Sequence, residues 1–237
     1  MATTTYIDAI LWDYDGTIAN SASKNIAITK QIISDVVPRL SGKNLPIHLK
    51  TESQYHIANH KAKNWQDLYL NFYKMTFDEM LTAGKLWSIY QQKNQTEVTL
   101  FSQIKETVNQ INIPQGICSQ NSTKNITKTL LNYNLNHKFS SIIGYDDIPN
   151  DKQKPAPFGG IKCLNQILHS LENKTIIYIG DHQADIEFAK NIEKELDSCK
   201  IISIGVTYSG ADISSWQIKP DIILEKPMDL INFIATY

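Results

Sequence analysis

The sequence predicts an α/β fold: a doubly wound, Rossmann-like parallel sheet as the core, with an inserted α-helical domain. Three observations lead to this class. Short apolar runs rich in Ile and Val recur along the chain, and they are nearly continuous rather than alternating, which is typical of strands covered on both faces. Helical patterns separate most of these runs from residue 97 onward. Residues 20–95, in contrast, show helical patterns and no convincing strand.

The core elements follow in chain order. Strands are predicted over the apolar runs at 6–12, 114–118, 141–144, 175–179, 201–206 and 221–224. Apolar residues at helical spacing predict helices around 100–111, 161–171 and 186–192. A further helix is expected after Ser122, which is a suitable N-cap residue. Because strands and helices alternate in this part of the chain, the connections are expected to cross over between parallel strands.

The inserted segment contains three helical stripes, at 28–36, 65–75 and 80–90, and a polar segment with Pro and Gly at 37–50. We therefore predict that the chain leaves the core after its first strand, at about residue 19, and returns to it near residue 95. The expected division is a core of residues 1–18 and 96–237 and a helical cap domain of residues 19–95.

Composition limits the classes of function. The 42% hydrophobic and 20% charged residues are typical of a globular protein. The 23 basic and 24 acidic residues nearly cancel, and Lys and Arg form no dense run, so neither nucleic acid nor an anionic membrane surface is expected as a partner. No run of about 18 apolar residues is present, so no membrane span is expected. No feature of the sequence assigns an oligomeric state.

The ends of the chain and the cysteines bear on localisation. The first residues, MATTTYIDAILW, lack a basic region followed by a long apolar one, so a signal peptide is not expected. Cys118, Cys163 and Cys199 are scattered and odd in number, which favours reduced core residues over a disulfide framework. A cytoplasmic protein is predicted.

Polar residues follow the predicted strands at the point where each strand ends. In an open parallel sheet these positions meet at one edge, where ligands bind. The residues collected in this way are Asp13 and Asp15, then Ser119, Gln120 and Asn121, then Lys154 in a loop, and Asp181 with Asp185. One edge of the sheet is thus expected to carry four carboxylates, a hydroxyl and a lysine.

This set of side chains is suited to binding a divalent cation together with an anionic substrate. Clustered carboxylates repel one another unless a hard divalent cation joins them, and oxygen ligands suit Mg²⁺. Such a cation favours an anionic substrate, most naturally a phosphate. Lys154 offers a positive charge, and Ser119 together with the backbone N–H of Gln120 offers hydrogen-bond donors.

Each element alone has an ordinary structural explanation. Two acids two residues apart are most often solvated, Lys154 before Pro155 can be a loop lysine, and Asp181 can cap the helix beginning near His182. His48, His56 and His60 do not form a zinc site, because only His56 and His60 share a helical face. The order of the acidic, hydroxyl and lysine residues at successive strand ends carries the functional prediction.

These residues fall into four short motifs, which begin at Asp13, Ser119, Lys154 and Gly180. In the order of these motifs the chain resembles the haloacid dehalogenase-like hydrolase superfamily, in the subgroup of phosphoglycolate phosphatases and β-phosphoglucomutase. The D-x-D-G-T signature is matched at 13–17, and the Ser or Thr after an apolar strand is matched by Ser119. The lysine of K-P-x-P is matched by Lys154, and G-D-x-x-x-D is matched at 180–185. The resemblance covers essentially the whole chain. It departs from the pattern at His182, where a small hydroxyl residue is common.

The resemblance implies roles for these residues. Asp13 is the expected nucleophile, which forms an aspartyl-phosphate, and Asp15 is the expected general acid and then base. Ser119, Gln120 and Lys154 are expected to hold the phosphoryl oxygens. The ligands implied for Mg²⁺ are the carboxylates of Asp13 and Asp181 and the backbone carbonyl of Asp15, with Asp185 adjusting their arrangement.

The predicted function is that of a Mg²⁺-dependent phosphatase acting on a small phosphorylated metabolite. A phosphomutase on the same scaffold is the alternative, because the motifs do not distinguish transfer to water from transfer back to substrate. A phospho-acceptor signalling domain is a weaker alternative, since such a domain needs neither the inserted helices nor two acids after the first strand. A non-catalytic binding protein is disfavoured by the intact Asp13, Asp15, Lys154 and Asp181.

Overall fold

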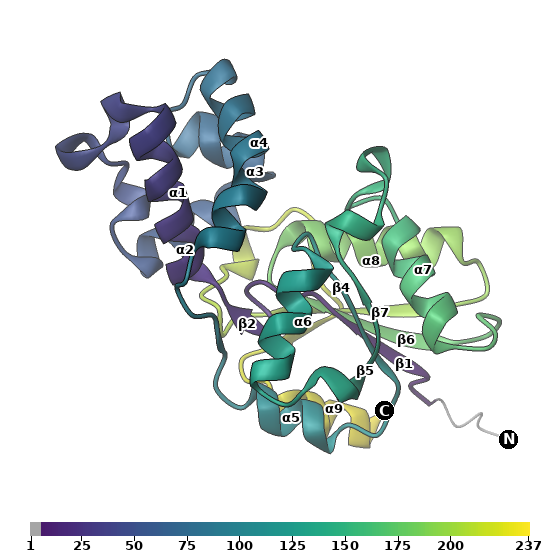
Figure 1. Cartoon of the computed structure of the whole chain (residues 1–237). Coiled ribbons are helices and arrows are strands. Elements are labelled where there is room, and N and C mark those ends of the chain that lie inside the picture. Colours follow the sequence, from purple (N-terminus) through teal and green to yellow (C-terminus); the bar gives the residue numbers. More distant parts are fainter. Residues whose placement is uncertain (1–5) are drawn as a thin grey trace, which may run out of the picture. The chain divides into compact units, whose positions relative to one another are not determined.

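The structure is a computed structural model that describes residues 6–237. The chain forms two compact units: one comprises the chain up to Ala19 together with Leu100–Tyr237, and the other comprises Asn20–Thr99. The sequence places these divisions at 18/19 and at 95/96. Each unit has its own hydrophobic core, and the colours of Figure 1 show that the insert interrupts the larger unit after its first strand.

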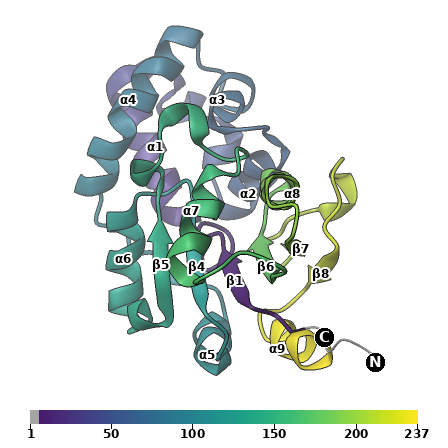
Figure 2. The ribbon, with the colours of Figure 1, turned by 90° about the vertical axis from the view of Figure 1, so that its right-hand side faces the viewer.

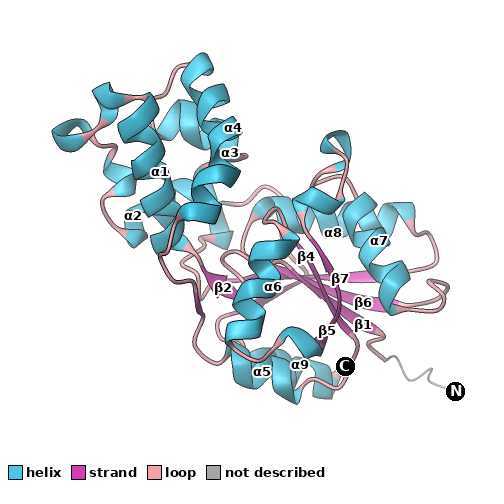
Figure 3. Ribbon diagram, viewed as in Figure 1, coloured by secondary structure: helices cyan, strands magenta, loops and turns pink. Residues whose placement is uncertain are grey.

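The larger unit is built on a six-stranded sheet in the order β5-β4-β1-β6-β7-β8, and every neighbouring pair is parallel. The strands, magenta in Figure 3, are β1 (Ala9–Trp12), β4 (Gln115–Cys118), β5 (Phe139–Ile143), β6 (Thr175–Gly180), β7 (Lys200–Val206) and β8 (Ile222–Leu224). All six lie where the apolar runs predict strands. The predicted doubly wound parallel sheet is therefore confirmed.

Helices cover both faces of this sheet. They are α5 (Ile104–Gln110), α6 (Thr123–Asn132), α7 (Phe158–Ile167), α8 (Gln183–Glu195) and α9 (Asp229–Thr236). Helix α7 packs on β4 and β5, and α8 packs on β6 and β7. Figure 2 shows α7 and α8 on one side of the sheet and the contacting pair α5 and α9 on the other.

Strand β1 lies at the centre of the sheet, and all four of its residues are buried. Ala9 and Leu11 belong to the core cluster under α7 and α8, and the intervening Ile10 and Trp12 are buried as well. The alternation of side chains along a strand explains why both sets must be apolar. Trp12 pairs with Ile117 of β4 and with Ile179 of β6, so these three strands end at nearly the same level.

The smaller unit is helical, as predicted. It contains α1 (Ala22–Val36), α2 (Glu52–Lys61), α3 (Trp65–Asp67), a π-helical turn (Leu68–Phe72) and α4 (Phe77–Lys93). Its core draws on α1, α2, the π-helical turn and α4. The segment with Pro and Gly forms three short 3-10 turns between α1 and α2.

Two very short strands lie where the chain passes between the units. Strand β2 (Ala19–Asn20) pairs with β3 (Thr99–Leu100) in a sheet of its own. Neither strand is predicted from the sequence, because two residues show no periodicity. Over residues 6–237, no helix is both long enough and apolar enough to cross a membrane.

Candidate active site

Three buried polar residues directly follow the three central strands. Asp13 follows β1, Ser119 follows β4 and Asp181 follows β6, and each is at most 7% exposed. Because these strands are parallel and end at nearly the same level, the three side chains are brought to one edge of the sheet. This is the juxtaposition that the order of the motifs predicts.

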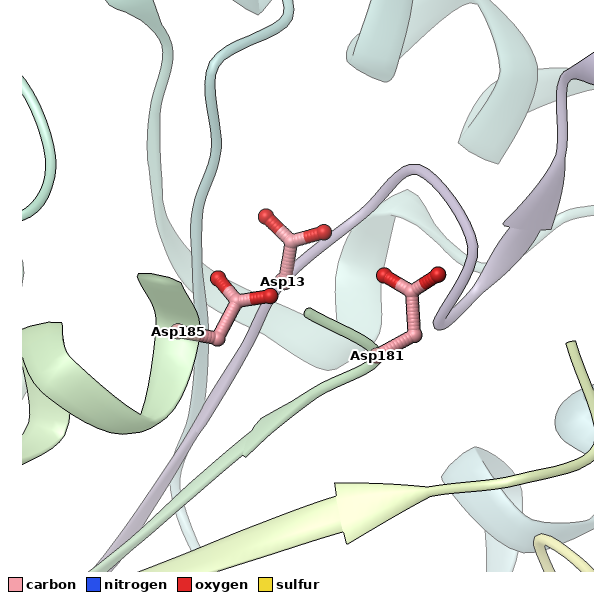
Figure 4. A group of neighbouring side chains, drawn as sticks. All are labelled: Asp13, Asp181 and Asp185. Carbon is pink, nitrogen blue, oxygen red and sulfur yellow. The ribbon is translucent and has the colours of Figure 1, made fainter. Parts of the chain in front are cut away.

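Asp13, Asp181 and Asp185 form a cluster of carboxylates. One oxygen from each can be chosen so that all three atoms lie within 4.8 Å of one another, and all three residues are buried. Asp185 comes from the first turn of α8, and Figure 4 shows the three carboxyl groups gathered at the ends of their elements. Asp15 is not a member of this group of side chains.

Lys154 is held at the cluster by two carboxylates and two rings. Its Nζ lies 2.7 Å from Asp13 Oδ1 and 2.9 Å from Asp185 Oδ1. The ammonium also lies 5.1 Å from the ring centre of Tyr178 and 5.2 Å from that of Phe188, which suits a cation–π contact. An ammonium has three donors and the carboxylates take two, so among the described residues one donor is left for an anion.

Asp185 is fixed by several donors. In addition to Lys154, its Oδ1 accepts a hydrogen bond from the Tyr178 hydroxyl at 3.2 Å, and its Oδ2 accepts one from the His182 backbone N–H at 3.2 Å. His182 is the N-cap of α8, and its Nδ1 accepts from the Ala184 N–H. The cap of this helix is thus His182 and not Asp181.

The electrostatics of the cluster favour a bound cation. Burial raises the pKa of Asp13 well above its usual range, and Asp185 and Asp181 add to this increase, whereas Lys154 opposes it. Burial acts to lower the pKa of Lys154, but the charges of Asp13 and Asp185 outweigh it and the pKa is raised. If all three acids are ionised, three carboxylates face one ammonium and two negative charges remain. A hard divalent cation with oxygen ligands, such as Mg²⁺, fits this excess and this donor set.

Two glycines leave space for the carboxylates. Gly16 has a φ of +79°, and a Cβ built on it would lie 2.0 Å from Asp181 Oδ2. A Cβ on Gly180 would lie 2.4 Å from Asp185 Cβ. The glycines that accompany the acids in the first and fourth motifs are therefore required by close packing against those acids.

The remaining predicted residues make hydrogen bonds in the neighbouring loops. Ser119 accepts a hydrogen bond at Oγ from the Asn121 N–H at 3.2 Å, and Ser122 rather than Ser119 caps α6, which leaves the Ser119 hydroxyl proton for another partner. Gln120 is exposed and donates through Nε2 to the Lys154 carbonyl oxygen at 3.5 Å. The carboxylate of Asp15 accepts from Asn121 Nδ2 at 2.9 Å.

The structure adds contacts that the motifs do not indicate. The sequence pattern predicts Tyr178 and Phe188 as core positions of a strand and a helix, and both are buried. Their rings nevertheless also contact the Lys154 ammonium. Asn121 follows the second motif without being part of it. The three cysteines are free and buried, as predicted, and burial raises the pKa of the Cys118 thiol, which makes it a poor nucleophile.

Comparisons with known proteins agree with this geometry. The family model described as haloacid dehalogenase-like hydrolase matches residues 10–196. A phosphoglycolate phosphatase of Pectobacterium atrosepticum is 25% identical, over 99% of this chain and 95% of that protein. One of Photorhabdus laumondii is also 25% identical, over 97% and 93%.

A solved structure shows the same fold. It is a hydrolase of the haloacid dehalogenase-like family from Streptococcus pneumoniae, and it superposes with a TM-score of 0.72 at 19% identity, covering 96% of this chain and 98% of its own. The matching fold, the matched residues and the cluster at the strand ends lead to one conclusion: the chain belongs to the haloacid dehalogenase-like hydrolases.

Proposed function

We propose that the protein is a Mg²⁺-dependent phosphatase that hydrolyses a small phosphomonoester through an aspartyl-phosphate. The observation that carries this proposal is the buried cluster of three carboxylates with one lysine at the ends of β1 and β6. The full-length relatives named phosphoglycolate phosphatase make 2-phosphoglycolate the first substrate to test.

In the first step, an oxygen of the Asp13 carboxylate forms a bond to phosphorus while the ester P–O bond breaks. The leaving alkoxide takes a proton from Asp15. In the second step, water attacks phosphorus, its proton passes to Asp15, and the Asp13–phosphorus bond breaks to release inorganic phosphate. Lys154 and Ser119 hold the phosphoryl oxygens in both steps.

Bound at Asp13, Asp181 and the Asp15 carbonyl, Mg²⁺ would supply positive charge that keeps Asp13 ionised and offsets the charge of the phosphoryl group. Asp185 would act indirectly, by holding Lys154 beside Asp13. The two residues that follow β1 therefore have different tasks. Asp13 attacks phosphorus, and Asp15 moves protons.

We assign substrate selection to the Asn20–Thr99 unit. It contains none of the residues of the four motifs, and it forms a separate helical unit with its own core. In this proposal it acts as a cap that excludes bulk water and selects the leaving group.

The direct test is phosphate release from a panel of small phosphomonoesters. The panel contains 2-phosphoglycolate, sugar phosphates and nucleoside monophosphates, each with Mg²⁺. A phosphatase releases inorganic phosphate from at least one member. Conversion of a sugar phosphate into its isomer without phosphate release would identify a phosphomutase instead, and no reaction with any member would contradict the proposal.

Asp15→Asn is expected to separate the two roles of the acids. General acid assistance contributes roughly 10²–10⁴-fold, and an alkoxide needs it far more than p-nitrophenolate does. Release of the leaving group in a single turnover should therefore slow much more for 2-phosphoglycolate than for p-nitrophenyl phosphate. Phosphoenzyme should accumulate with the aryl ester, because its hydrolysis still needs the base. Equal defects with both esters would remove Asp15 from the acid role.

Gly16→Ala is expected to disturb the cation site, because its methyl group would occupy the space of the Asp181 carboxylate. The Mg²⁺ concentration for half-maximal activity should rise by about 10–100-fold, the size of effect seen when groups that orient metal ligands are altered. Gly210→Ala is the matched control: its φ of +90° imposes similar backbone strain, but nothing lies within 4 Å of the added Cβ. If both variants change the Mg²⁺ requirement equally, strain rather than contact with Asp181 is the cause.

A further inference from the structure

Asn121 lies in the loop between β4 and α6 and contacts two residues of the proposed mechanism. It is 8% exposed. Its side-chain Nδ2 donates to Asp15 Oδ2 at 2.9 Å, although the two residues are 106 positions apart in sequence. Its backbone N–H donates to Ser119 Oγ at 3.2 Å. One residue thus connects the proposed proton carrier with a proposed phosphate-binding hydroxyl.

The orientation of the Asn121 amide follows from its partners. Oδ1 accepts from the Ser122 N–H at 2.8 Å and from Asn125 Nδ2 at 3.4 Å. A carbonyl oxygen is required on that side, because the Ser122 backbone N–H can only donate, and the NH₂ group must then face Asp15. The polarity of the contact with Asp15 is therefore set by the start of α6.

The backbone of Asn121 is held as well. Its carbonyl oxygen accepts from the Tyr145 N–H at 3.0 Å, and its N–H is occupied by Ser119. A side chain that is fixed at its backbone and at its amide oxygen loses little further freedom when it binds a carboxylate. It can therefore hold that carboxylate in one rotamer.

We propose that Asn121 is a positioning residue for Asp15: it holds the Asp15 carboxyl group in the rotamer from which the leaving group receives its proton. The proposal rests on the function proposed above. Asp15 lies beyond the end of β1, in an isolated bridge with Ala19 that holds its backbone but does not set the rotamer of its side chain. Without Asn121, its carboxyl group would sample other rotamers, and misplacement by about 1 Å can cost on the order of 10²-fold in rate.

The test compares two esters in a single turnover. Asn121→Ala keeps the backbone hydrogen bonds to Ser119 and Tyr145 and removes the donor to Asp15. Release of the leaving group from 2-phosphoglycolate should slow by about 10–100-fold, whereas release from p-nitrophenyl phosphate should change by less than about threefold. Equal slowing of both esters would overturn the proposal.

Thr123→Val is the structural control. Thr123 belongs to the same segment and bonds through its hydroxyl to the Gly144 N–H at 2.9 Å and to Asp147, but not to Asp15. It should lower the melting temperature without changing the ratio of the two rates. If it changes that ratio as Asn121→Ala does, general loosening of the segment explains the effect and the proposal fails.

A double-mutant cycle separates this proposal from the proposed function. If Asn121 acts only through Asp15, Asn121→Ala should cause no further loss in an Asp15→Asn background, whereas additive losses would overturn the proposal. Should Asn121→Ala lower stability strongly, the same cycle is run with Asn121→Ser, which keeps a polar side chain beside the Ser122 N–H. If another phosphomonoester of the panel is the substrate, it replaces 2-phosphoglycolate in this comparison. Wild-type protein that releases phosphate from no member of the panel would instead contradict the phosphatase assignment itself.

Discussion

Asp13→Asn should lose turnover on the order of 10⁶-fold, the loss typical of removing a covalent nucleophile. An amide cannot form the acyl phosphate, so no alternative position of the side chain restores the reaction. The protein should nevertheless fold. In the metal-free protein, burial raises the pKa of Asp13, which means that folding disfavours the ionised carboxylate, and an amide of the same shape does not carry that cost. The variant should therefore melt at an equal or higher temperature.

The matched control for this prediction is Asp151→Asn, which removes an exposed carboxylate outside the cluster. It should retain the wild-type rate. Turnover by Asp13→Asn within tenfold of wild type would mean that another group attacks phosphorus. A complete loss of folding would mean that the ion pair with Lys154 matters for stability more than the burial of the charge does.

Removal of divalent cations should lower turnover by about 10³-fold or more, because charge stabilisation by a bound metal contributes several kcal/mol to such reactions. Added Mg²⁺ should restore activity. Ca²⁺ should restore it poorly, since its coordination is larger and looser. Full activity in excess chelator would contradict the cation site.

Binding of Mg²⁺ to the cluster can also be measured without turnover. Mg²⁺ should raise the melting temperature of the wild type, because a ligand bound only to the folded state stabilises it by about 2.7 kcal/mol at 100 times its dissociation constant. Asp181→Asn should lose this shift, and Asp151→Asn should keep it. An equal shift in all three proteins would place the cation elsewhere.

The strands were predictable because parallel strands are buried on both faces and their sequences are continuously apolar. The first and last residues of each strand were harder to predict. The first run was expected to begin at residue 6, but β1 begins at Ala9, and Asp8 instead binds the Lys174 ammonium and the Thr175 N–H. Periodicity does not show that the side chain of an acid at the margin of an apolar run binds a neighbouring residue, so it does not fix where the strand begins.

The sequence gives little indication of two of the helices, α2 and α9, because neither shows a single apolar stripe. Only Tyr55 and Ala58 of α2 are buried, so the helix has no apolar stripe. Helix α9 is short, and its sequence DLINFIAT is apolar on more than one side. A short apolar run does not distinguish a helix from a strand by its period alone.

The site could be predicted in outline because parallel strands bring their carboxyl ends to one edge. Its finer contacts depend on rotamers. The hydrogen bond from Asn121 to Asp15 joins residues on different loops, and nothing in the spacing distinguishes Asn121 from an ordinary loop residue. Tyr178 fits the apolar pattern of β6, so its bond to Asp185 appears only once the strand and α8 are packed together.

The most direct test of the central claim is to trap the covalent intermediate. The enzyme is mixed with phosphate-labelled 2-phosphoglycolate and Mg²⁺, quenched in acid within a turnover, digested, and the label is located by mass spectrometry. The label should lie on Asp13, and Asp13→Asn should acquire none. Label on any other residue, or rapid turnover that leaves no labelled protein even in Asp15→Asn, would contradict an aspartyl-phosphate formed on Asp13.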